Sequence, residues 1–216
     1  MTKSFKTFLK HAGKDYYNQT VNPPVVRAST LIFKSLEEIR KTQNKAIKEP
    51  IGGHFAYGRE GSSTIFALQK ILRTLEESYQ VFLTPTGFGS VFLAIFSVVR
   101  PGDEILLSDP IYSPTRLLTE NYLKEFNIKA NFYNPNNIND LKKKISKKTK
   151  LIFVENPGSN TFEFQDLSKI VALAKKNKIF TAMDNTWGTP YFIKPIKLGF
   201  DMSIVAATKY YSGHSD

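Results

Sequence analysis

Beyond about residue 80, short apolar runs alternate with longer stretches of helical periodicity, and this alternation constrains the fold more than any other feature of the sequence. Neighbouring parallel strands need a helix-length crossover between them, so the pattern is typical of a parallel sheet covered by helices. We predict an α/β fold of three layers, in which a parallel-rich sheet carries helices on both faces. The predicted strands are residues 80–83, 104–107, 128–133, 151–155, 179–184 and 202–206.

Helical periodicity predicts the elements between these strands, with helices through residues 95–99, over 115–126 and over 166–176. The lysine-rich stretch 141–150 is expected to be an amphipathic helix. Leu141 and Ile145 lie one turn apart there and leave a basic face for solvent.

The first 60 residues lack this alternation. They contain Asn22-Pro23-Pro24, a Pro-Ile-Gly-Gly stretch at 50–53 and one short helical pattern near 36–42. Irregular arms of this kind commonly become ordered against a partner surface. We therefore predict an N-terminal arm over residues 1–60 that contributes to a subunit interface, a large domain over residues 61–216, and a homo-oligomer.

Composition excludes several function classes. The chain has no cysteine, which rules out disulfides, thiolate metal sites and cysteine nucleophiles. The three histidines are His11, His54 and His214. They lack the spacing of metal ligands on a helix, so no metal site is expected. The net charge of +11 could attract nucleic acid, but the lysine-rich stretch has no interleaved aromatic or arginine residues. We predict no nucleic-acid partner.

Membrane association is not expected either. The longest apolar stretch, residues 91–99, is far shorter than the roughly 20 residues that span a bilayer. The first twenty residues contain lysines but no apolar segment of the kind found in secretory signals. A cytoplasmic location is therefore the expectation.

Chemically useful residues follow the predicted strands, where open parallel sheets bind their ligands. A single lysine taken alone is seldom catalytic. Lys209, however, follows an apolar strand, where partial desolvation would lower its pKa and make it nucleophilic. Asp184 also follows an apolar strand and needs a cationic partner, for which a protonated pyridine nitrogen would serve.

The remaining candidates are weak individually. The turn Gly87-Phe88-Gly89 could offer backbone N–H groups to a phosphate, although glycines mark ordinary turns equally well. Tyr112 could stack on a ring or simply pack. A lysine for covalent attachment, an acid, a phosphate turn and an aromatic ring are together what pyridoxal phosphate requires of a protein.

Six stretches of the chain resemble, in the same order, the Cys/Met metabolism family of pyridoxal-phosphate enzymes, which has the aspartate aminotransferase fold (fold type I). They are YGREGSSTIFALQKILRTLE (57–76), PTGFGS (85–90), DPIYSPT (109–115), VENPGSNTFEFQDL (154–167), DNTWGTP (184–190) and AATKYYSGHSD (206–216). Within the family, ENPGSNT and AATKYYSGHSD are most similar to bacterial cystathionine β-lyases.

The resemblance implies a role for each candidate residue. Lys209 would form the Schiff base with the cofactor and, with help from Tyr112, remove the substrate's Cα proton. Asp184 would pair with the pyridine nitrogen and Tyr112 would stack on the ring. The phosphate would be held by the backbone of Gly87 and Phe88 and by the hydroxyl of Thr208. One departure is Ala206, where many relatives have a phosphate-binding serine.

Tyr57 and Arg59 match family residues that reach the phosphate of a neighbouring subunit. The resemblance therefore implies active sites shared across a dimer, and a homotetramer built as a dimer of dimers. Family members also continue beyond the lysine. The large domain would thus be incomplete here and the C-terminal domain absent, together with the arginine that binds the substrate's α-carboxylate. None of the six arginines matches that position: Arg27, Arg40, Arg59, Arg73, Arg100 and Arg116.

The implied reaction is β-elimination of cystathionine to homocysteine, pyruvate and ammonia, a step of methionine biosynthesis. Two alternatives stay open. The chain could be an inactive truncated remnant or a cofactor-binding subunit that needs a separate C-terminal half. It could also be a cystathionine γ-synthase, a γ-lyase or another sulfur amino acid lyase of the same family.

Overall fold

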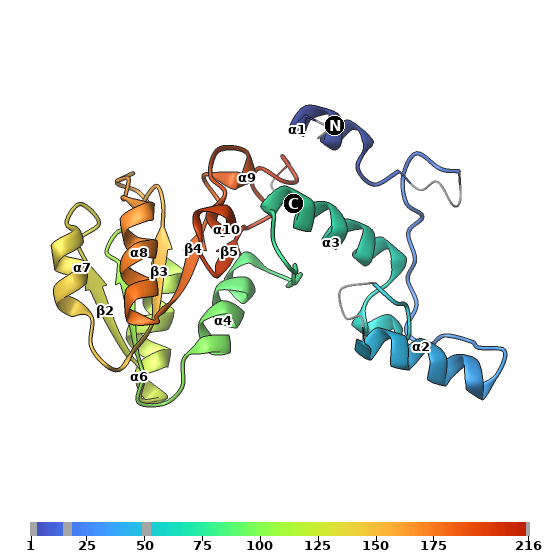
Figure 1. The fold of residues 1–216 in the computed structure, drawn as a ribbon, viewed down its shortest axis with the longest axis horizontal. Helices are drawn as coiled ribbons and strands as arrows, with labels where there is room; N and C mark the ends of the chain where they lie inside the picture. The colour runs from blue at the N-terminus through green and yellow to red at the C-terminus, as the bar shows by residue number, and fades with distance from the viewer. Residues whose placement is uncertain (1–3, 15–18, 49–52, 215–216) are drawn as a thin grey trace. The chain divides into compact units, whose positions relative to one another are not determined.

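The computed structural model describes residues 4–14, 19–48 and 53–214 of the 216-residue chain. The chain divides into two compact units, Met1–Phe82 and Leu83–Asp216. Figure 1 labels the helices and strands of both. This division falls later than the predicted boundary at residue 60. The proposed interface role of the arm stays a prediction.

The second unit is built on a five-stranded parallel sheet with the strand order β2-β1-β3-β4-β5. This arrangement confirms the predicted α/β class. The strands are β1 (Glu104–Ser108), β2 (Lys129–Tyr133), β3 (Thr149–Glu155), β4 (Phe180–Asp184) and β5 (Met202–Ile204).

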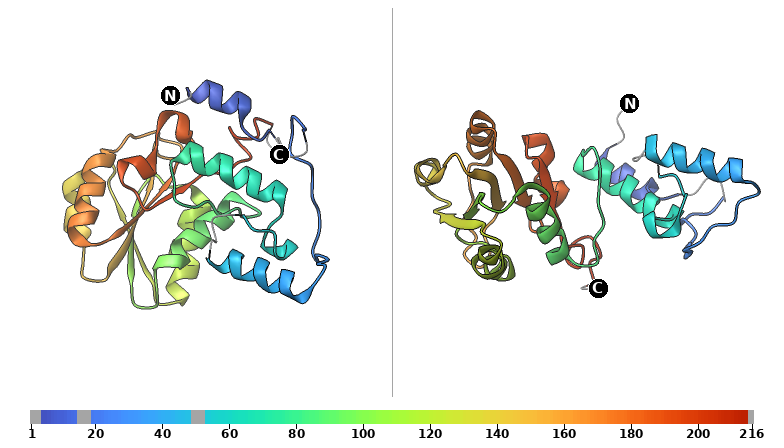
Figure 2. Two further views of the ribbon diagram at one scale, coloured as in Figure 1. Left: turned by 45° about the vertical axis from the view of Figure 1, so that its right-hand side comes forward. Right: turned by 90° about the horizontal axis from the view of Figure 1, so that it is seen from below.

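Helices cover both faces of this sheet, and Figure 2 shows the layers from two further sides. On one face lie α4 (Gly87–Val98) and the continuous helical stretch α5 (Ser113–Leu117), η2 (Leu118–Tyr122) and α6 (Leu123–Glu125). On the other face lie α7 (Ile138–Lys144), α8 (Leu167–Asn177) and α10 (Pro195–Leu198), and the short helix α9 (Thr189–Phe192) follows β4.

The central strands are apolar on both sides because both faces are covered. Alternate residues enter different cores. The core beneath α4 includes Ile105, Leu107, Leu151 and Phe153. The core beneath α7 and α8 includes Leu106, Ile152 and Val154. Burial of these side chains on two sides fixes the register of β1 and β3, whose carboxyl ends carry the candidate site.

The first unit contains α1 (Phe5–His11), α2 (Leu36–Lys48), η1 (Gly58–Glu60) and α3 (Ser63–Glu76). The described parts of α1 and α2 contain no buried residue. Thr64 ties the irregular segment to α3, because its hydroxyl accepts the Val26 N–H at 2.8 Å and donates to the Pro24 carbonyl at 2.7 Å. The helix predicted near residues 36–42 is present and longer, whereas α3 was not predicted.

Two predicted elements are wrong. Residues 80–83 form no strand, and the Val81 carbonyl accepts a hydrogen bond from the Gln69 side chain at 2.9 Å rather than from a strand neighbour. The lysine-rich helix ends at Lys144 instead of continuing to residue 150. Ser146 donates its N–H to the Thr149 hydroxyl at 2.9 Å, which turns the chain into β3. Within the described residues, no helix is long and apolar enough to cross a membrane.

Candidate active site

Two carboxyl groups stand at the ends of the adjacent strands β3 and β4. Glu155 and Asp184 are paired in the register of these strands, so parallel pairing brings their side chains to one edge of the sheet. Asp184 was predicted as a site residue. Glu155 was not among the predicted site residues, although its sequence signal is the same: an acid at the end of an apolar strand.

Burial raises the pKa of Asp184 above its ordinary value. Hydrogen bonds from Thr186 act in the opposite direction, one of them from its N–H to Asp184 Oδ1 at 3.0 Å, and so does the positive charge of Lys209. The carboxyl group therefore favours a cationic partner. Lys209 lies close enough for its charge to act on Asp184.

Glu155 is 7% exposed. Burial first, and the charge of Asp184 second, raise the pKa of Glu155 to about 8. Its Oε2 accepts the Tyr112 N–H at 2.6 Å; this bond and the nearby Ser159 side chain act in the opposite direction and lower the pKa. Glu155 thus connects the acidic pair to the loop that carries Tyr112.

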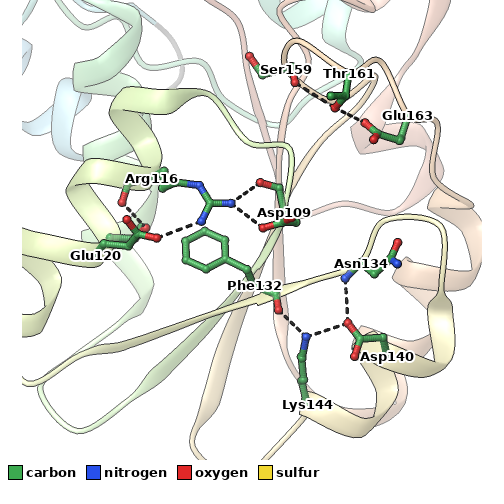
Figure 3. A network of polar contacts seen from close by, with 11 residues as sticks. Asp109, Arg116, Glu120, Phe132, Asn134, Asp140, Lys144, Ser159, Thr161 and Glu163 are labelled. Atoms are coloured by element: carbon green, nitrogen blue, oxygen red, sulfur yellow. Dashed lines mark hydrogen bonds and ion pairs between the residues drawn. The ribbon is translucent and has the colours of Figure 1, made fainter.

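Tyr112 precedes α5 in the loop after β1, and its side chain is 45% exposed. The start of this loop is held by Arg116, which donates to the Asp109 carboxylate at 2.6 Å and to Glu120 at 3.0 Å (Figure 3). The guanidinium carbon also lies 3.8 Å from the centre of the Phe132 ring, a cation–π contact. These contacts place the loop without using the tyrosine ring.

Beside these contacts the structure has a cavity of about 790 Å³. Figure 3 shows several of the polar side chains around it. Four of its charged side chains are paired, Arg116 with Asp109 and Lys144 with Asp140. Lys144 donates to Asp140 at 2.8 Å and to the Phe132 carbonyl at 2.6 Å. The fifth, Glu163, accepts a hydrogen bond from the Thr161 hydroxyl at 2.5 Å. The cavity borders the loop that carries Tyr112. Its two cations, Arg116 and Lys144, are both paired with carboxylates, so neither offers an unpaired positive charge to that loop.

The predicted phosphate turn forms the first turn of α4. Thr86 caps this helix, and its hydroxyl accepts the Gly89 N–H at 2.9 Å. Within the described part of the chain, no hydrogen bond is made by the N–H groups of Gly87 and Phe88, which are the donors predicted to bind phosphate. A helix N-terminus with two such donors suits an anion.

A close backbone approach joins this turn to the segment after β5. A Cβ atom at Gly87 would lie 2.7 Å from the Cβ of Ala206, closer than side chains pack. The same segment is tied to the Asp184 loop, because the Ala206 N–H donates to the Thr186 hydroxyl at 2.9 Å and the Asn185 N–H donates to the Ile204 carbonyl at 2.7 Å. The turn at Gly87, the acid Asp184 and the segment that leads to Lys209 therefore lie in one region.

Lys209 lies in a turn beyond β5, where its carbonyl accepts the Gly213 N–H at 2.9 Å. Lys209 and Thr208 are both exposed. The expected desolvation of the lysine at a strand end is wrong for this chain, because β5 ends at Ile204 and the following residues turn outward. The amine is instead accessible from solvent.

Tyr57 and Arg59 belong to the first unit. The Arg59 guanidinium carbon lies 5.1 Å from the centre of the Tyr57 ring, so the two side chains form a local pair around η1. Their predicted contact with the phosphate of a neighbouring subunit stays a prediction.

Comparison with known proteins gives the site a family context. The model of the Cys/Met metabolism PLP-dependent enzyme family matches residues 6–216. The cystathionine beta-lyase of Bordetella avium is 35% identical over 220 residues, which cover 99% of this chain and 54% of that protein. The L-alanine/L-glutamate racemase of Wolbachia pipientis is 34% identical over 219 residues, which cover 98% of this chain and 54% of that protein.

A solved structure from Campylobacter jejuni has a TM-score of 0.81 and 26% sequence identity. It contains N′-pyridoxyl-lysine-5′-monophosphate, and the match covers 93% of this chain and 48% of that one. The present chain thus spans about half the length of the relatives it matches.

Proposed function

The chain belongs to the Cys/Met metabolism family of pyridoxal-phosphate-dependent enzymes, and we propose that it forms the cofactor-binding part of a carbon–sulfur lyase that cleaves cystathionine. The observation that carries this proposal is the gathering of Asp184, the Gly87 turn and the Lys209 loop at one edge of the sheet. Substrate, reaction and partners all belong to the proposal, because the chain spans about half of its relatives.

The residues present fit pyridoxal 5′-phosphate. Asp184 is an acid whose burial disfavours a lone negative charge, so it suits the protonated pyridine nitrogen. The N–H groups of Gly87 and Phe88 suit the phosphate, and the hydroxyl of Thr208 would add a donor. Lys209 provides the amine for covalent attachment. When bound, the cofactor supplies an electron sink for the carbanion at the substrate's Cα.

Side chains of this chain would then remove the proton from the substrate's Cα. The Lys209 amine would accept the Cα proton, and the Tyr112 hydroxyl would assist from the loop after β1. Asp184, as a carboxylate, would hold the pyridine nitrogen of the cofactor and favour its protonated form. Loss of the thiolate from Cβ gives homocysteine, and hydrolysis of the remaining fragment gives pyruvate and ammonia.

Relatives named cystathionine beta-lyase support cystathionine as the substrate, whereas a racemase among the relatives points to a different reaction. The Bordetella lyase and the Wolbachia racemase match this chain with nearly equal identity. Both reactions begin with removal of a Cα proton, so the lysine and acid described above serve either one. Leaving-group chemistry, rather than the cofactor site, separates the two reactions.

The partners proposed for this chain are copies of itself. Tyr57 and Arg59 would complete the phosphate site of a neighbouring subunit in a dimer of dimers, with residues 1–60 forming part of the interface. The arginine for the substrate carboxylate would come from a C-terminal half outside these 216 residues, because an arginine fork binds carboxylates in a bidentate manner. We place the reaction in cytoplasmic methionine biosynthesis.

A product assay tests the proposal. The chain is purified with pyridoxal phosphate and incubated with L-cystathionine, and separately with L-alanine. Slow release of pyruvate and homocysteine is the expected result, because the arginine proposed to bind the substrate carboxylate lies outside these 216 residues. Release of 2-oxobutyrate would assign a γ-lyase instead, and racemisation of alanine without pyruvate would assign the racemase reaction. Cofactor binding without any of these products would favour a cofactor-binding subunit that needs a separate C-terminal half.

A further inference from the structure

The carboxyl group of Glu155 is a buried titratable group at the candidate site for which the proposed reaction has no use. It lies at the end of β3, the central strand, between the Tyr112 loop after β1 and Asp184 on β4. A buried carboxyl group costs free energy unless its hydrogen bonds compensate, so its contacts indicate what it does.

Those contacts point toward Tyr112. Glu155 Oε2 accepts the Tyr112 N–H at 2.6 Å, and the nearby Ser159 side chain favours the ionised form of the carboxyl group. Ser159 in turn donates its own N–H to the Pro110 carbonyl at 2.7 Å. Glu155 and Ser159 thus hold two peptide groups of the same short loop.

The main chain of Glu155 is itself held firmly. Its N–H donates to the Ser108 hydroxyl at 3.2 Å, and its carbonyl accepts Gln165 Nε2 at 3.0 Å. Gln165 is fixed by the Tyr133 hydroxyl, which donates to Gln165 Oε1 at 2.7 Å. The carboxyl group therefore projects from a rigid base, which is what a positioning group needs.

Arg116 holds the opposite end of the loop through Asp109, as Figure 3 shows. Glu155 is the side chain that fixes the peptide group of the tyrosine itself. The main-chain position at Tyr112 sets where its ring can lie, because the ring reaches the site through only two side-chain torsions.

We propose that Glu155 is a positioning residue, which holds the Tyr112 main chain so that the ring lies against the bound cofactor. This inference rests on the proposed cofactor site and adds a residue to it. Glu155 does this best as a neutral carboxylic acid, since it then leaves Asp184 as the single negative charge of the pair. The groups that face Glu155 are Asp184 on β4, Ser159 and the Tyr112 N–H, and Lys209 acts on Asp184.

The test measures binding of pyridoxal phosphate to the full 216-residue chain. Trp187 is the single tryptophan, and its ring centre lies 6.2 Å from that of Tyr210, the neighbour of Lys209, so quenching of its fluorescence reports binding. Circular dichroism of the bound cofactor reports the asymmetry that a stacked tyrosine imposes. We expect Glu155→Ala to weaken binding about tenfold, because the partly buried Tyr112 N–H loses its hydrogen-bond acceptor, and to reduce the dichroism.

Asp201→Asn is the matched control. Asp201 is also a carboxylate that accepts a backbone N–H, from Thr181 at 2.8 Å, but at the amino end of β4 in the same sheet. Its substitution should lower stability without changing the cofactor's affinity or dichroism. An equal loss in both variants would overturn the proposal, because it would show general destabilisation.

Glu155→Gln keeps the shape and an acceptor oxygen, and serves if Glu155→Ala does not fold. We expect wild-type affinity to fall as pH rises through about 8, where Glu155 ionises, and the Gln variant to lose that part of the dependence. Identical pH profiles would contradict the proposal.

A double-mutant cycle separates positioning from a direct contact. If Glu155 acts through the tyrosine, Glu155→Ala should add less than twofold to the loss already caused by Tyr112→Ala. Fully additive losses would overturn the inference. Failure of the wild-type chain to bind pyridoxal phosphate at all would instead contradict the proposed function.

Discussion

Glu155 and Asp184 meet at the ends of neighbouring strands, and their burial determines how the folded chain responds to pH. Both pKa values are raised, that of Glu155 to about 8 from an ordinary value near 4.5. Between these two values the folded chain keeps a proton that the unfolded chain has released. The free energy of unfolding should therefore fall as pH rises from about 4.5 to about 8, and level off above that.

The slope for one such carboxyl group approaches about 1.4 kcal/mol per pH unit. Urea denaturation at a series of pH values measures it, and Glu155→Gln should flatten the curve in this window. The lowered pKa values of Asp140 and Asp166 act in the opposite direction, but below this window. A stability that does not change from pH 5 to 8 would show that the Glu155 pKa is not raised.

Single residues also show where sequence reasoning stops. Asp184 could be predicted because an acid directly after an apolar strand is conspicuous. Glu155 occupies the same position after β3, but its role depends on a hydrogen bond to a residue 43 positions away. The exposure of Lys209 could not be predicted either, since it depends on where β5 ends.

At the scale of elements, the contact of α4 with the segment after β5 brings the phosphate turn to the lysine loop. Gly87→Ala would place a methyl group 2.7 Å from the Ala206 Cβ, so one backbone segment must move. We expect pyridoxal phosphate to bind at least about tenfold more weakly, an effect of about 1.4 kcal/mol.

Thr86→Ala is the control for this prediction. It removes the cap of α4, with a cost of about 1 kcal/mol in stability, but introduces no clash with Ala206. Affinity should fall less in the Thr86 variant than in the Gly87 variant, when both are measured by Trp187 fluorescence. The reverse order would mean that helix capping, rather than close approach, governs the site.

Most elements of the sheet unit could be predicted because periodicity and apolar runs are local properties. The strands that frame the site begin or end within two residues of the predicted positions, as β3 and β4 show. The prediction of a strand at residues 80–83 was wrong, because an apolar run does not show whether a neighbouring strand exists to pair with it. The lysine-rich helix failed because helical periodicity continued across a turn made by Ser146 and Thr149.

At the scale of the whole molecule, the structure places the division between units after Phe82, whereas the sequence suggests residue 60. Limited chymotrypsin digestion distinguishes the two. Tyr79 and Phe82 are 82% and 71% exposed in a segment without regular structure, while Tyr133 and Phe153 are buried in the sheet. We expect a resistant fragment that begins near residue 83 and retains all five strands. A resistant fragment that begins near residue 61 would favour the boundary suggested by the sequence.

The central claim is that this chain carries pyridoxal phosphate covalently on Lys209. The most direct measurement is borohydride reduction of the chain incubated with the cofactor, followed by peptide mass spectrometry. We expect the cofactor on the peptide that contains Lys209, and we expect Lys209→Arg to abolish the modification while the fold is retained. Modification spread over the surface lysines, or an unmodified Lys209 in a folded chain, would contradict it.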